Sequence, residues 1–476
     1  MKRDIDLRGA SRRDFIKGVL ATSAALGLGP TRALEALDGL GGSALAQEAA
    51  KLKYSVNFVG GTGGGSWFTQ IFPVPNVIKN FAAGMAYDDI TKAEKISGVD
   101  GGRDLYMRKL RTGKRLWSEY GDRKLISALP CGRPQAHEVA PSVASSTNLL
   151  PGGVGGPVNL YAGFAAIQTS LKALVPSIGM KFNNVDMPYG RAPGAPPQSS
   201  VADAASMIAL FSSAASQVMS RLQATQNQAA YELYYKAFLG LAKNSSRATF
   251  QRAFGDSRVA LSLLAKNLRS ALEPKPGQAD MWMGGIAANE KVRAITESMI
   301  VTANAFKLGL CAQVTIPCFN DDPHGAFGSI SNVSNVTDAT ASALQFFLDD
   351  LAKVPDASVP GRTLADKVIM TFTADTFKDP FTAAGWPDGY TANVNWIYVM
   401  SQGLVKPGWF GDVRRDGKTN YDPATGMLSA GVPDDMQRSG ALAAVLYAAA
   451  GGDSRRVRDF YNAGDFGGLV NVSLTG

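Results

Sequence analysis

The residues best suited to chemistry lie in one short stretch, residues 318–328, which reads CFNDDPHGAFG. It holds His324, one of only two histidines in the 476-residue chain, and Asp322 two positions earlier. A carboxylate oxygen and an imidazole nitrogen are both ligands for divalent metal ions. Asp-Pro also opens ordinary turns, so the pattern predicts either a metal or catalytic site or a plain surface turn.

The elements expected around this stretch place it where α/β proteins bind ligands. Residues 314–319 form an apolar run that predicts a buried strand, and residues 335–353 follow with helical spacing. A strand, a short polar loop and a helix would put Asp322 and His324 at the C-terminal end of a strand. Ligands of open α/β sheets bind at that edge.

Two further stretches are candidate sites. His137 and Glu138 lie between proline- and glycine-rich segments, and the alternative is an exposed loop histidine, because metal sites need several converging ligands. Residues 51–58 alternate as a strand and run into VGGTGGGSW, whose core is Gly61-Thr62-Gly63-Gly64. These glycines permit positive φ, and their amides could hold an anion or a nucleotide, but the full G-x-G-x-x-G spacing is absent and a tight loop remains the alternative.

The rest of the chain predicts an α/β fold. Apolar runs at 367–373 and 396–400 are typical of buried strands, and strands alternate with helical patterns, which favours a mostly parallel sheet. Residues 200–273 repeat an amphipathic helical pattern after the proline-rich segment 186–199. We therefore expect a helical insertion there.

Composition excludes some classes of protein. The net charge is +8, and the one dense basic region, eight Lys or Arg in residues 103–124, has no interleaved aromatic stacking pattern, which argues against nucleic-acid binding. No segment beyond residue 46 reaches 18 uninterrupted apolar residues, so no membrane span is expected there. Cys311 and Cys318 would lie about 20 Å apart along one strand, too far for a disulfide, and with Cys131 they predict buried free thiols.

The N-terminus carries a targeting pattern. Residues 11–17 read SRRDFIK, an apolar run at 18–29 is too short to span a bilayer, and Ala-Leu-Ala at 44–46 is a small-x-small cleavage site. The pattern resembles a twin-arginine export signal, residues 1–46. The resemblance implies export by the twin-arginine translocase, after folding, to the periplasm or the exterior. Cleavage after residue 46 would leave 47–476, a length that one large α/β domain with an insertion can use.

Several motifs resemble one superfamily when they are taken together. They are the export signal, Phe58-Val-Gly-Gly61, Asp322-Pro-His324, the strand 367–371 and the segment 399–411. In this order they are similar to the uncharacterised, twin-arginine-exported branch of the alkaline phosphatase/sulfatase superfamily, best at 300–450 and plausibly at 50–75. The resemblance implies a three-layer α/β/α sandwich with a metal site at the C-terminal ends of the strands.

The chain departs from that pattern at the expected metal site. The Asp that usually ends the first strand reads Gly63 or Gly64, the usual Ser-Glu-Phe-Gly-Arg reads TFTAD at 371–375, and the usual Asp-His-Gly keeps Asp388 but has no histidine. Two-metal hydrolases depend on many converging Asp and His ligands. The resemblance therefore implies at most one divalent metal, held by the trio Asp322, His324 and Asp388.

Three functions follow as hypotheses. The first is a periplasmic or cell-envelope protein with a reduced metal site, acting through binding or in an assembly. The second is a working metal-dependent hydrolase of phosphate or sulfate esters. The third is an exported oxidoreductase that holds a nucleotide cofactor at the 59–67 loop. Metal analysis separates the first two, and the absorption spectrum of the purified protein tests the third.

Overall fold

The computed structural model describes residues 52–212 and 268–474, with internal gaps; the longest gaps are 110–115, 132–146, 150–157 and 389–394. Nearly all described residues belong to one compact unit, made of Lys51–Leu210 and Arg269–Gly476. The predicted export signal, the middle of the predicted insertion, and His137 with Glu138 lie outside the described residues.

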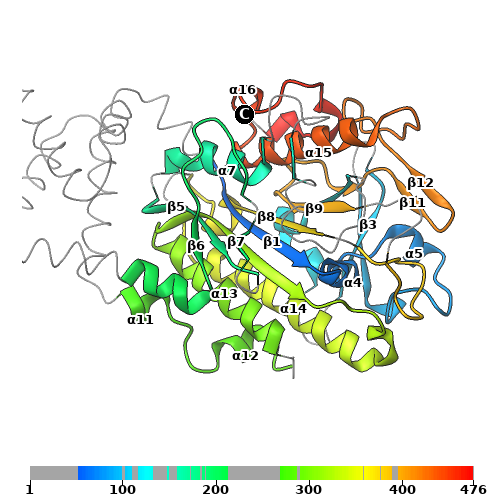
Figure 1. The fold of residues 1–476 in the computed structure, drawn as a ribbon, viewed down its shortest axis with the longest axis horizontal. Helices are drawn as coiled ribbons and strands as arrows, with labels where there is room; N and C mark the ends of the chain where they lie inside the picture. Colours follow the sequence, from blue (N-terminus) through cyan, green and yellow to red (C-terminus); the bar gives the residue numbers. More distant parts are fainter. Residues whose placement is uncertain are drawn as a thin grey trace, which may run out of the picture. The chain divides into compact units, whose positions relative to one another are not determined.

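An eight-stranded sheet forms the centre of this unit (Figure 1). Its strands are β1 Tyr54–Gly61, β4 Ile126–Pro130, β5 Val175–Met180, β6 Ser199–Val201, β7 Cys311–Asn320, β8 Val368–Ala374, β9 Trp396–Met400 and β10 Gly408–Trp409. They pair in the order β10-β4-β9-β8-β1-β7-β5-β6. Only β9 runs antiparallel to its neighbours within this sheet, and the other pairs are parallel. The predicted α/β class with a mostly parallel sheet is confirmed.

Strand β1 lies between β7 and β8, and burial on both faces explains the apolar runs in the sequence. Phe58 pairs in register with Ile316 on one side and Phe372 on the other. The rings of Phe58 and Phe372 stack with their centroids 4.9 Å apart. A strand covered on both faces has no polar side to alternate with, so such strands read as continuous apolar stretches.

Helices cover both faces of the sheet (Figure 1). Helices α7 Leu160–Gln168 and α15 Asp434–Ala449 pack on one face, where they share a core with β8 and β9 residues. Helices α13 Glu290–Lys307 and α14 Ile330–Ala352 lie across the other face. Helix α14 begins five residues before the predicted 335, so the loop after β7 is shorter than expected.

Shorter elements surround this sandwich. They are α4 Trp67–Ile71, α5 Pro75–Lys79, β2 Ala93–Ile96, β3 Leu105–Arg108, α11 Leu268–Leu272, α12 Gln278–Trp282, β11 Asp412–Arg414, β12 Gly417–Thr419 and α16 Ser454–Arg458. All three cysteines are buried thiols, as predicted. Within the described part of the chain, no helix has the length and apolar character needed to cross a bilayer.

Candidate functional site

The loop after β7 carries two of the predicted site residues. Phe319, one residue before the end of β7, takes a positive φ of 53°, and Gly325 takes a φ of 74° before the chain enters α14. Between them, Pro323 restricts the backbone of the short segment that presents Asp322 and His324. Both side chains therefore lie at the C-terminal end of a central parallel strand, as the sequence predicts.

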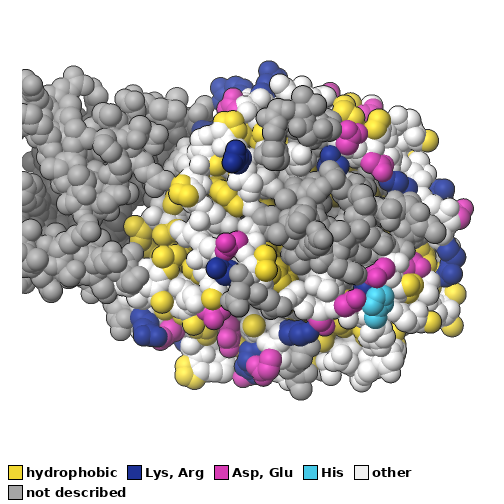
Figure 2. Space-filling model, in the orientation of Figure 1, with side chains coloured by type: hydrophobic (Ala, Val, Ile, Leu, Met, Phe, Trp, Pro, Cys, Tyr) yellow, Lys and Arg dark blue, Asp and Glu magenta, His cyan; other side chains and the backbone are white. Residues whose placement is uncertain are grey.

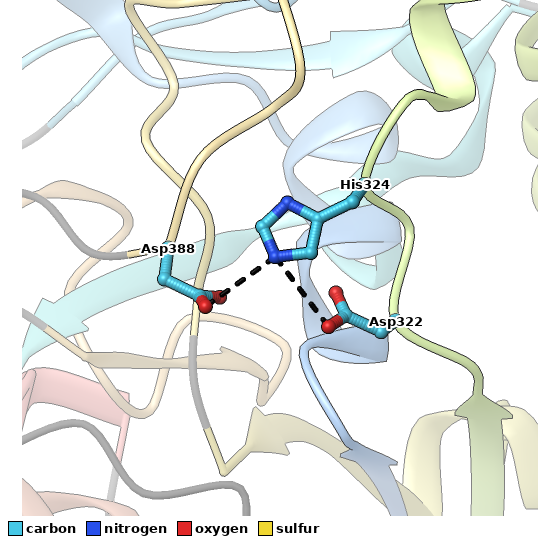
Figure 3. Close-up of side chains that lie close together, drawn as sticks. All are labelled: Asp322, His324 and Asp388. Atoms are coloured by element: carbon cyan, nitrogen blue, oxygen red, sulfur yellow. Dashed lines mark hydrogen bonds and ion pairs between the residues drawn. The ribbon is translucent and has the colours of Figure 1, made fainter.

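The third residue comes from the loop after β8, and the structure brings the predicted trio together (Figure 3). Because β7 and β8 flank β1, the loops at their carboxyl ends meet above the end of β1. One ligand atom from each of Asp322, His324 and Asp388 lies within 4.8 Å of the others. Among the described residues this is the only such group of three His, Cys, Asp or Glu side chains.

Hydrogen bonds orient the imidazole of His324. Its Nδ1 lies 2.9 Å from the Gly385 carbonyl oxygen, which can only accept, so Nδ1 carries the proton and donates it. In the neutral ring Nε2 is then an acceptor and can accept from Lys378 Nζ at 3.0 Å, whereas Asp388 Oδ2 at 3.3 Å and Asp322 Oδ2 at 3.4 Å could pair with it only in the protonated ring. The bond to the Gly385 carbonyl raises the pKa of His324, with help from the two carboxylates and against the opposing effect of Lys378. Metal-binding histidines are commonly oriented by such a bond.

Sequence reasoning missed the residue at the centre of this cluster, Lys378. Its Nζ lies 2.6 Å from Asp322 Oδ1 and 3.0 Å from His324 Nε2, and it also forms an ion pair with Asp388 Oδ1. The lysine side chain has no solvent exposure, whereas the three side chains around it are 34–43% exposed. Figure 2 shows the histidine at the surface with acidic side chains beside it. The available sequence signal was a lysine four residues after β8. The carboxyl ends of parallel strands lie at one edge of a sheet, so a lysine there is expected near the loop that carries Asp322 and His324.

The position of Lys378 decides whether the trio fits a metal ion. A divalent ion bound by these side chains would lie about 2.0–2.2 Å from each donor atom. The ammonium group contacts all three donors, so it occupies the same place between them. As the side chains stand, the cluster therefore fits one cation, and that cation is the lysine. A metal ion fits only after Lys378 withdraws.

The glycine loop after β1 packs against this cluster. Gly63 takes a φ of 77°, and its N–H donates to Asp375 Oδ1 at 2.9 Å. A Cβ atom on Gly63 would lie 2.7 Å from Lys378 Cε, and one on Gly64 would lie 1.4 Å from the Phe319 carbonyl oxygen. Close packing accounts for these two glycines without a bound anion. The anion role predicted for residues 61–64 stays a prediction.

Two departures from the superfamily pattern have structural consequences. Phe372, which stands where the resemblance has a Glu, is buried and stacks on Phe58. Asp375, which stands where the resemblance has an Arg, is buried and accepts the Gly63 N–H, tying the glycine loop to the end of β8. Neither residue joins the three-donor group around His324.

Comparison with protein-family models, characterised proteins and solved structures gives no match for this chain. The resemblance to the alkaline phosphatase/sulfatase superfamily therefore stays a prediction from the sequence motifs.

Proposed function

We propose that the protein is an exported, alkaline-phosphatase-like protein whose metal site is reduced, and that it acts through binding or in a cell-envelope assembly. The observation that carries this proposal is the lack of space for further ligands. At Gly64 a side chain would collide with the Phe319 carbonyl, and at Gly63 it would collide with Lys378. These are the positions where the superfamily pattern has an Asp, so neither glycine offers a second metal a side-chain ligand.

The charge of the cluster also argues against ester hydrolysis. Two carboxylates, Asp322 and Asp388, surround one ammonium group, so the net charge is −1 when His324 is neutral. Two-metal hydrolases stabilise the attacking and leaving oxygens with their positive ions. A cluster with net negative charge would repel a phosphate or sulfate ester. It favours a ligand that carries positive charge or donates hydrogen bonds.

One observation keeps a metal-dependent hydrolase as a second candidate. His324 donates Nδ1–H to the Gly385 carbonyl, and this directs the Nε2 lone pair toward the two carboxylates. The same arrangement orients histidines in metal sites. If Lys378 leaves the cluster, Asp322, His324 and Asp388 are the residues that would hold one divalent metal, which would then act as a Lewis acid.

The test is to purify the protein, measure bound zinc, manganese and calcium, and assay simple phosphate and sulfate esters. We expect well under one metal ion per chain and no turnover of the esters. His324→Ala should therefore give the same result as wild type. Two tightly bound metal ions per chain, together with turnover that His324→Ala abolishes, would refute the reduced site and establish a true hydrolase.

Export has its own test. The paired arginines Arg12 and Arg13 are the residues that the twin-arginine route would need. Replacing both with lysine keeps the charge of the N-terminus and should trap the precursor in the cytoplasm, which cell fractionation measures. Unchanged export of the lysine variant would rule out this route.

A further inference from the structure

We propose that Lys378 is the resident cation of the strand-end site: its ammonium group takes the place of a divalent ion, so a metal binds only by displacing it. The lysine's role rests on the reduced site proposed above, because it supplies the reason why the remaining donors hold no metal. It also makes a prediction of its own, that removing one side chain creates a metal site.

The hydrogen-bonding capacity of the lysine matches its surroundings. An ammonium group has three N–H donors and no acceptor. Lys378 has three partners for them, namely Asp322 Oδ1, Asp388 Oδ1 and His324 Nε2. Since the side chain is fully buried, the ammonium has exchanged its water for these three acceptors. A charge buried in this way is stable only when it is paired and hydrogen-bonded.

The backbone of Lys378 is also held in place. Its N–H donates to Ser66 Oγ at 2.6 Å, and residue 378 forms an antiparallel bridge with Asp388. The ammonium therefore extends from a backbone that is fixed at both the glycine loop and the loop carrying Asp388. An exposed lysine would lose more rotamer entropy on forming the same ion pairs.

Gly63 provides the space that the lysine occupies. A Cβ atom there would lie 2.7 Å from Lys378 Cε, closer than real Cβ atoms approach other atoms, and 3.1 Å from Nζ, so the lysine would have to shift. A longer side chain at position 63 and the observed lysine conformation exclude each other. Glycine at position 63 and the position of the lysine ammonium therefore depend on each other in this structure.

The experiment is a calorimetric titration of the full chain with zinc chloride, which measures the affinity for zinc. Wild type is compared with Lys378→Met, which removes the charge. Lys378→Gln also removes the charge but keeps an N–H donor, so it replaces the Met variant if that variant fails to fold. Lys367→Met is the matched control, because the Lys367 side chain is only 12% exposed, is paired with Asp356 at 3.6 Å and lies at the other end of β8.

We expect either Lys378 variant to bind one zinc ion at least about 100-fold more tightly than wild type, because a like charge beside the metal is removed. Adding His324→Ala should abolish this gain, and the Lys367 control should bind like wild type. One tightly bound zinc in the wild type, or no gain in either Lys378 variant, would overturn the lysine's role. Two metals with ester turnover in the wild type would refute the proposed function as well, so the two failures are distinguishable.

Discussion

Two clusters among the described residues have a fully buried cation between two carboxylates, and they differ in how much water reaches them. In the first, the Arg108 cluster, Arg108 pairs with Asp88 through both terminal nitrogens and with Asp338 through Nε, at 2.5–2.8 Å, and all three side chains are buried. In the second, the Lys378 cluster, only the lysine is buried, and its two carboxylates are 34% and 39% exposed.

The difference teaches which cluster can have a function. The guanidinium of Arg108 is a rigid fork whose donors join β3 to α14 and to the loop before β2, with no face open to a ligand. The ammonium of Lys378 is a point charge beneath acceptors that solvent reaches, and another cation can replace it. A buried cation between two carboxylates is therefore a structural link in one place and a candidate site in the other.

The largest effect should follow from breaking the structural link. Arg108→Met removes the cation that buried Asp88 and Asp338 share and leaves Asp88 with Lys92 at 3.2 Å, which should lower the free energy of unfolding by about 3–5 kcal/mol. Urea denaturation measures it. The control is Arg269→Met, because Arg269 and Glu273 form an exposed pair, 72% and 46% exposed, whose loss should cost less than about 1 kcal/mol. Equal costs would show that burial does not separate these pairs.

Acid should weaken the same link. Burial alone would raise the pKa of Asp88, but the hydrogen bond and charge of Arg108, with the Ser334 hydroxyl, lower it from 3.8 to about 2. A carboxylate whose pKa is lower in the folded state stabilises the fold above its unfolded pKa. This contribution should disappear as the pH falls from about 4 toward 2. Urea denaturation at a series of pH values should show that the free energy of unfolding falls less steeply with acid for Arg108→Met than for wild type. An equal pH dependence in the two proteins would contradict the link between Arg108 and Asp88.

A smaller effect should separate packing from backbone strain at the Lys378 cluster. Gly63→Ala introduces a side chain at positive φ, which costs about 1–2 kcal/mol in any left-handed position. Gly361→Ala is the control, because Gly361 has a nearly identical φ of 78° and open space around its Cβ position. The position-63 variant should be the less stable of the two, because its Cβ meets Lys378. If urea denaturation shows that both variants lose the same free energy of unfolding, Gly63 does not provide the space for the lysine.

Local patterns were sufficient for much of the fold. Continuous apolar runs predicted β7, β8 and β9, because strands buried on both faces have no polar side. The same reasoning placed Asp322 and His324 at a strand end, since they follow a buried strand directly. Asp388 could be reached only through the order of motifs in the resemblance, because no local pattern marks its loop.

The amino-acid sequence by itself therefore determined the α/β class and two donors of the site, since both depend on neighbours along the chain. Tertiary structure alone decided that Lys378, 54 residues after His324, fills the space between the donors. The reason is the strand order β7-β1-β8, which joins loops that are far apart in sequence at one edge of the sheet. Side-chain spacing does not encode that order, so only the folded chain shows which cation meets which carboxylates.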